Sequence, residues 1–155
     1  MTEVRLATLA DKDNLLKLCS MLHSENALFP MDEQLVSDKL DHALKAQGGI
    51  VGVIGSPDDL EACIYVELAK FWYTKYYHLE EFWSFVRPDK RQSNHAKNLI
   101  SFAKKTADRL KLPLVIGIVS NHRTEAKCRL YQRQLPKAGE YFLYNYNSES
   151  TLAHG

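Results

Sequence analysis

The sequence is poor in cysteine, in net charge and in long apolar runs. Its 155 residues include only Cys19, Cys63 and Cys128, which are too far apart to predict a disulfide framework or a zinc site. The formal net charge of +1 gives no overall bias toward nucleic acid or anionic membranes. No apolar run approaches the roughly 20 residues of a membrane span. We therefore expect three buried free thiols, no metal and no membrane contact.

The ends of the chain and its composition predict one cytoplasmic domain. The N-terminus, MTEVRLATLADKD, is acidic and mixed, unlike a signal or transit peptide. With 45% hydrophobic and 25% charged residues, the composition is ordinary for a globular protein kept in a reducing compartment. We expect a single domain over residues 1–146, followed by a flexible polar tail at 147–155.

Hydrophobic periodicity predicts an α/β fold with the order β-α-α-β-β-β-α-β-α-β. Asp11 or Asp13 is expected to cap the first helix, and Asp32 is expected to cap the second, which stops at Gly48-Gly49. The apolar run at Pro113–Val119 is typical of a central strand that is buried on both faces. The other expected strands are Val4–Ala7, Ile50–Ile54, Leu60–Phe71, His78–Val86 and Tyr141–Tyr146, and the last two helices run from Ser93 or Asn94 to Leu110 and over Glu125–Leu135.

The segment Val86–Ala96, reading VRPDKRQSNHA, joins a predicted strand to a predicted helix. The first N–H groups of a helix lack partners within the helix, and the helix dipole adds partial positive charge there. Four basic residues surround this point and one acidic residue opposes them: Arg87, Lys90, Arg91, Lys97 and Asp89. The segment therefore predicts a site for a phosphate or a diphosphate.

This segment resembles the acyl-CoA-binding loop of the GNAT acetyltransferases, Val-x-Pro-x-x-Arg/Gln-x-x-Gly-x-Gly/Ala. Val86, Pro88, Arg91 and Ala96 match the pattern, and Asn94 stands where the family has its first glycine. Asparagine tolerates the left-handed backbone region better than most residues do. The resemblance implies a cofactor site made by Val86, Arg91, Gln92, Ser93, Asn94, His95, Ala96 and Lys97.

A second match follows the Pro113–Val119 run. Asn121, Ala126, Leu130 and Tyr131 fit the family arrangement Asn…Ala-x-x-x-Leu-Tyr. The resemblance implies that Asn121 contacts the cofactor arm and that Tyr131 protonates the leaving thiolate. The family continues with Gly-Phe, whereas this chain has residues 136–141, PKAGEY. That ending, together with Asn94, is similar to phage and prophage members.

The resemblance also implies an architecture and a reaction. The fold is a mixed sheet of six or seven strands with about four helices, in which two parallel strands, Leu79–Val86 and Pro113–Val119, splay apart around pantetheine. The reaction is direct transfer of an acetyl group from acetyl-CoA to an amine, with no metal. The general base is one of Glu80, Glu81 and His78, and because side chains alternate along a strand, at most one of the two glutamates faces the acceptor.

Several alternatives stay open at this point. His95 and His122 favour surface or capping roles over catalysis. The aromatic cluster Phe71–Tyr77 packs over the sheet, lines an acceptor pocket or forms a homodimer contact. The basic last helix is expected to be solvated, so nucleic acid is not an expected partner. The acceptor amine is unspecified, and the competing hypothesis is a non-catalytic CoA-binding or interaction module with the same fold.

Overall fold

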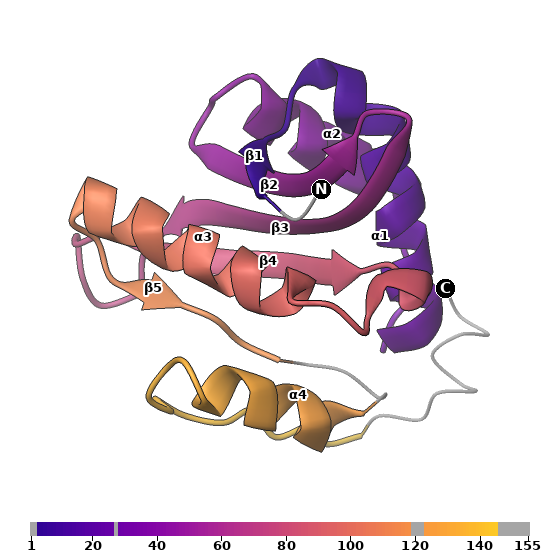
Figure 1. Ribbon diagram of the computed structural model, residues 1–155. Helices are drawn as coiled ribbons and strands as arrows, with labels where there is room; N and C mark the ends of the chain where they lie inside the picture. The colour runs from indigo at the N-terminus through magenta and orange to yellow at the C-terminus, as the bar shows by residue number, and fades with distance from the viewer. Residues whose placement is uncertain (1–2, 27, 119–122, 146–155) are drawn as a thin grey trace.

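The computed structural model describes residues 3–26, 28–118 and 123–145 and shows a five-stranded sheet with helices on both faces (Figure 1). The strands, in chain order and in sheet order, are β1 (Arg5–Leu6), β2 (Gly49–Ser56), β3 (Asp59–Ala69), β4 (His78–Val86) and β5 (Leu114–Val115). The helices are α1 (Lys12–Asn26), α2 (Glu33–Leu44), α3 (His95–Leu110) and α4 (Thr124–Gln132), with short 3-10 turns at Leu9–Asp11 and Pro88–Lys90.

The first four strands pair antiparallel, and β5 pairs parallel to β4 after the chain crosses over through α3. Eight residue pairs join β3 to β4, but only two join β4 to β5. Two irregularities bend the sheet, one between Ile54 and Gly55 and one between Tyr65 and Val66. At the second of these, β4 holds one extra residue, because Tyr65 pairs with Trp83 and Val66 pairs with Glu81.

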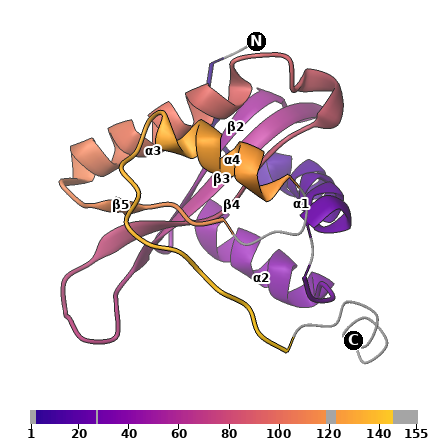
Figure 2. The ribbon, with the colours of Figure 1, turned by 90° about the horizontal axis from the view of Figure 1, so that it is seen from below.

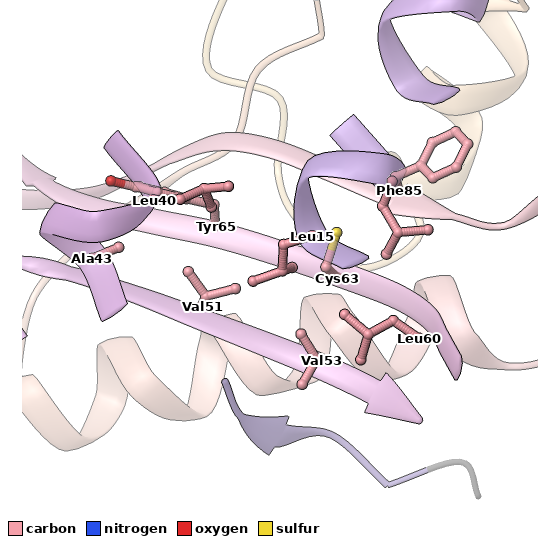
Figure 3. Close-up of a cluster of buried hydrophobic side chains, with 10 residues drawn as sticks. Leu15, Leu40, Ala43, Val51, Val53, Leu60, Cys63, Tyr65 and Phe85 are labelled. Carbon is pink, nitrogen blue, oxygen red and sulfur yellow. The ribbon is translucent and has the colours of Figure 1, made fainter. Parts of the chain in front are cut away.

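Two buried clusters hold the helices against the sheet. One lies between the sheet and the α1–α2 pair and contains Leu15, Leu40, Val53, Tyr65 and Phe85, among others (Figure 3). The second lies under α3, where alternate residues of β3 meet one side of the helix at Leu99, Ala103 and Ala107. Cys19 and Cys63 are buried free thiols, as expected, and burial raises the pKa of both, whereas Cys128 on α4 is only partly buried.

Of the predicted helix caps, Asp32 is confirmed, whereas the Asp11 side chain has a different role. The Asp32 carboxylate accepts a hydrogen bond from the Leu35 N–H at 2.9 Å, so the predicted cap of α2 is confirmed. Asp11 instead closes the 3-10 turn before α1 and is fully buried. It accepts hydrogen bonds from the Thr8 N–H at 2.8 Å and from the Arg5 guanidinium at 2.8 and 3.0 Å, which ties β1 to the helix.

Three expectations about boundaries were wrong. The second helix ends at Leu44, before the predicted glycine pair. A central strand was expected over Pro113–Val119, but in the described part of this range, residues 113–118, only Leu114–Val115 is strand, and it forms the edge of the described sheet. No strand forms over the described part of Tyr141–Tyr146, where four consecutive apolar side chains are exposed. The described sheet therefore has five strands, fewer than the six or seven expected.

Along the described ranges, no helix combines the length and the apolar character needed to cross a bilayer. The expected tail at 147–155 lies outside the described residues.

Candidate active site

β4 and β5 pair over a short stretch only and then separate. Their register pairs Leu79 with Leu114 and Glu80 with Val115, and among the described residues no strand pairs with β4 on this side from Glu81 onward. The α4 helix lies along this open edge of the sheet, beyond β5 (Figures 1 and 2). Backbone groups of a strand require hydrogen-bond partners, so the open stretch of β4 is suited to bind a chain that carries amide groups.

The two adjacent glutamates of β4 lie on opposite faces of the sheet. Glu80 shares its face with His78, whose Nε2 lies 3.4 Å from the Glu80 Oε1. Glu81 lies opposite Val66 in the register of β3 and β4, and Val66 belongs to the core under α3. The expectation that the two carboxylates point apart is therefore confirmed by the geometry.

Glu81 is a half-buried residue at the point where the strands separate. Its Oε2 is buried and has no hydrogen-bond partner among the described residues. Burial raises the pKa of Glu81 to about 8. A carboxyl group held partly neutral near physiological pH is a candidate proton acceptor.

Tyr131 reaches from α4 to the same place. Its hydroxyl lies 3.1 Å from the Ser84 Oγ, which is on the open part of β4. Burial raises the pKa of Tyr131 above its usual range, the negative charge of Glu81 adds to this increase, and the Ser84 hydrogen bond opposes it. The structure thus brings together Glu81 and Tyr131, which the sequence singled out, and Ser84, which it missed because a lone serine in a strand carries no signal.

The other two base candidates are placed differently. The ring of His78 is only 4% exposed and stacks on Phe71 with 4.6 Å between ring centroids. Glu80 is partly exposed beside it. Both residues lie on the face away from Tyr131, so Glu81 is the base candidate that the geometry favours.

The loop between β4 and α3 adopts its path without a left-handed residue. Asn94, the N-cap of α3, has φ −90° and ψ 14°, and no residue of the loop has positive φ. The asparagine that replaces the family glycine is therefore compatible with the backbone here. The Ser93 hydroxyl accepts a hydrogen bond from the His95 N–H at 3.2 Å and donates to the Lys90 carbonyl, so the loop is internally braced.

Most of the positive charge of the loop is paired with carboxylates. Arg87 binds Asp59 at 2.7 Å and Asp89 at 2.6 Å, which raises the pKa of its guanidinium. Lys90 lies 3.4 Å from Glu61. These pairs weaken the electrostatic argument for the anion site, because neighbouring carboxylates offset the cations that the sequence placed around it.

Arg91 reaches across to the end of α1. Its guanidinium donates to both oxygens of Glu25, at 2.9 and 2.7 Å, and to the Val86 carbonyl at 3.0 Å. It also lies over the Phe85 ring at 5.2 Å. A phosphate at this place would have to share Arg91 with Glu25.

The remaining residues that were predicted to bind the cofactor differ in their solvent exposure. Gln92, Ser93, Asn94 and Lys97 are exposed, and Val86 and Ala96 are partly buried. The expected surface or capping role of His95 was wrong: His95 is 3% exposed, its Nε2 lies 3.4 Å from Glu61, and the N-cap of α3 is Asn94. The expected contact of His95 with a cofactor is therefore limited to the backbone. Asn121 and His122 lie outside the described residues.

The aromatic cluster after β3 does not pack over the sheet as a whole. Phe71 stacks on His78, but Trp72 is 95% exposed, and Tyr73 and Tyr76 are exposed with it. Packing over the sheet thus accounts for Phe71 alone, and the other two alternatives for the cluster stay predictions.

Comparison with known proteins gives the fold. No protein-family model and no curated protein matches the sequence. Solved structures do match: a "possible acetyltransferase" from Clostridium difficile 630 at 18% identity and TM-score 0.71, covering 94% of this chain and 96% of that one. A "predicted acetyltransferase with acetyl-CoA" from Clostridium acetobutylicum matches at 12% identity and TM-score 0.74, with the same coverage. A "GNAT family acetyltransferase" from Staphylococcus aureus matches at 12% identity and TM-score 0.64, covering 92% and 96%. At such low identities the likeness concerns architecture: this chain has the fold of the GNAT acetyltransferases.

Proposed function

We propose that this protein transfers an acetyl group from acetyl-CoA to an amine by direct attack. The observation that carries the proposal is the separation of β4 from β5 after Glu80, with Glu81 and Tyr131 gathered beside it. The matching fold of proteins described as acetyltransferases, one of them with acetyl-CoA, supports the same class of reaction.

The open edge of β4 fits an amide-bearing arm of acyl-CoA. From Glu81 onward the strand offers backbone groups that no described neighbour pairs with, which would hold pantetheine as an added strand. The loop from Val86 to Lys97 lies at the far end of this edge and would hold the diphosphate, with Arg91 and Lys97 as its cations. Asn121 is proposed as a further contact to the arm. When bound, acetyl-CoA supplies an acyl group that is activated as a thioester.

The side chains at the separation can move the two protons of the reaction. An amine must lose a proton to become a stable amide, and Glu81 takes that proton on its carboxylate. Backbone N–H groups of the open part of β4 can stabilise negative charge on the carbonyl oxygen. Tyr131 gives its proton to the departing sulfur, and the Ser84 hydroxyl can donate to the phenolate that remains. The proton on Glu81 then balances the one that Tyr131 lost.

The experiment that tests the proposal separates binding from turnover. We expect acetyl-CoA to raise the melting temperature of the full chain, and free thiol to appear when a panel of amines is added near pH 8, where Glu81 is partly ionised. Stabilisation with no thiol release for any amine would favour the competing hypothesis of a non-catalytic CoA-binding module. If neither response occurs, both hypotheses fail.

Arg91→Ala is expected to weaken CoA binding about tenfold, because a guanidinium–phosphate hydrogen bond is charge-assisted and a tenfold change needs only about 1.4 kcal/mol. Isothermal titration calorimetry with CoA measures the change. Glu25→Gln should instead strengthen CoA binding, because it removes the carboxylate that pairs with the Arg91 guanidinium. Arg109→Ala is the control, because Arg109 is in the last turn of α3, at the opposite end from the loop. An unchanged dissociation constant in Arg91→Ala would remove Arg91 from the cofactor site.

A further inference from the structure

An ammonium group of the chain itself occupies a small site on the face of the sheet opposite Glu81. The Nζ of Lys39, from α2, lies 3.6 Å from the Oε2 of Glu67 on β3. The same Nζ lies 5.1 Å from the centroid of the Phe82 ring on β4. A carboxylate on one side and an aromatic face on the other are the two groups that bind organic cations in proteins.

The walls of this site are fixed by the sheet. Glu67 is only 7% exposed, and its Oε2 is buried and accepts no hydrogen bond among the described residues. The Phe82 ring stacks on the buried Tyr65 ring, with 5.4 Å between centroids and 10° between planes. Phe82 is the extra residue of the β4 irregularity, which turns it onto the same face as Tyr65. The site therefore consists of rigid strand residues rather than of a loop.

Two carboxylates of neighbouring strands lie on this face of the sheet, each beside a histidine. Glu80 lies directly opposite Glu67 in the register of β3 and β4, so their side chains share one face. His42 approaches Glu67 from α2, with its Nε2 3.4 Å from Oε1, and His78 lies beside Glu80 at 3.4 Å. The Lys39 ammonium itself contacts Glu67 and the Phe82 ring.

Lys39 is a replaceable occupant. Its side chain is 52% exposed, and a half-exposed lysine contributes little through an ion pair at 3.6 Å or through a cation over a ring. Because the stem of lysine is long and flexible, the ammonium can move into water while Glu67 and Phe82 stay in place. An incoming ammonium group would then restore the same charge pairing.

We propose that Glu67 and Phe82 form a binding site for a primary ammonium group of a ligand, which takes the place of the Lys39 ammonium. Resting on the proposed function, the inference further names the acceptor class. Glu67 and Glu81 lie on opposite faces of the sheet, so the ammonium held at Glu67 is not the nitrogen that Glu81 deprotonates. The acceptor is therefore a diamine or another amine that carries a second cationic group.

The binding part of the proposal is tested without acetyl-CoA. Butylamine, protonated at neutral pH, is titrated into the full chain against butanol, its neutral analogue, and the Phe82 and Tyr65 ring signals are followed by NMR. We expect the ammonium compound alone to shift these signals. Lys39→Met should tighten binding about tenfold by removing the competing ammonium, and Glu67→Gln should weaken it by about the same factor. Equal responses to butylamine and butanol would overturn the site.

A second variant guards against misfolding of Glu67→Gln. Phe82→Leu keeps an apolar side chain of similar size but removes the ring, and we expect butylamine binding to weaken with the thermal transition preserved. Unchanged affinity in Phe82→Leu together with unchanged affinity in Lys39→Met would also reject the site.

Turnover separates the site from the reaction. With acetyl-CoA present, diaminobutane should show at least tenfold higher kcat/KM than butylamine, and Glu67→Gln should remove this preference by raising KM. If butylamine binds as described but no amine releases thiol, the proposed function fails and the cation site stands. If both amines turn over equally in the wild-type chain, the acceptor assignment fails while the acetyl transfer stands.

Discussion

Replacement of Glu81 by glutamine is expected to lower kcat/KM for acetyl transfer by about 10² to 10⁴, the usual contribution of a positioned general base. The part of the wild-type activity that depends on Glu81 should rise with pH and level off above about 8, because burial raises the pKa of Glu81 to about 8. The fraction of neutral amine also rises with pH, but it rises equally in both proteins. The ratio of wild-type to Glu81→Gln activity, measured across pH 5 to 10, therefore isolates Glu81.

The same substitution has an effect on stability that needs no substrate. The pKa of Glu81 is about 8 in the folded chain and about 4.5 for the free group, so between these values the folded state binds one more proton than the unfolded state. The free energy of unfolding then falls as pH rises, by at most about 1.4 kcal/mol per pH unit, or roughly 5 kcal/mol over the whole interval. Urea denaturation at a series of pH values measures this slope.

Glu81→Gln should flatten that slope, because glutamine does not titrate. The variant should therefore be more stable than the wild-type chain above pH 8, although it is less active. Glu80→Gln is the control for the stability measurement, since burial of Glu81 is the cause of the shift and the neighbouring side chain lies on the other face. Parallel stability profiles of the wild-type chain and Glu81→Gln would show that the carboxyl group of Glu81 is not buried as described.

Gly55→Ala is expected to destabilise the fold by roughly 2–4 kcal/mol, the combined cost of backbone strain and a close contact. Gly55 has φ +109°, and a Cβ placed there would lie 2.4 Å from the Asp59 carbonyl oxygen. It lies at the irregularity between β2 and β3, and its carbonyl accepts hydrogen bonds from Arg5 at 2.9 and 3.1 Å. For a domain of this size the melting temperature should fall by roughly 6–12 °C, measured by calorimetry.

Gly139→Ala is the matched control for that measurement. A Cβ at Gly139 would have no heavy atom within 4 Å, so its effect should stay within about 0.5 kcal/mol. A fall in melting temperature for Gly55→Ala no larger than that for Gly139→Ala would contradict the described geometry of the β2–β3 turn.

Local signals predicted the inner part of the fold. The bounds of β4, His78–Val86, agree with the pattern residue for residue, and the Asp32 cap was recognisable because its side chain acts within one turn. The outer part was predicted wrongly. An apolar run such as Pro113–Val119 shows that a segment can be buried, but the number of strands that pair with it depends on distant parts of the chain. The strand predicted from the alternating aromatic residues of Tyr141–Tyr146 was wrong for the same reason.

Some features of the candidate site were also predictable from the sequence, and others were not. The alternation of side chains along β4 separated Glu80 from Glu81, and the resemblance pointed to Tyr131. The burial of Glu81 and the contact of Tyr131 with Ser84 could not be predicted, because they depend on how α4 lies on the open sheet edge. Pairing of Arg91 with Glu25 joins residues 66 positions apart, and no local pattern records it.

Because only two residue pairs join β4 to β5, the two sides of this junction should differ in their stability toward local unfolding. Amide protons of β3, paired on both sides, should exchange with solvent only when the whole domain unfolds, whereas those of β5 and α4 should exchange through local detachment of the C-terminal quarter. Anything that bridges β4 to the chain beyond Val115 would convert these two regions into one cooperative unit.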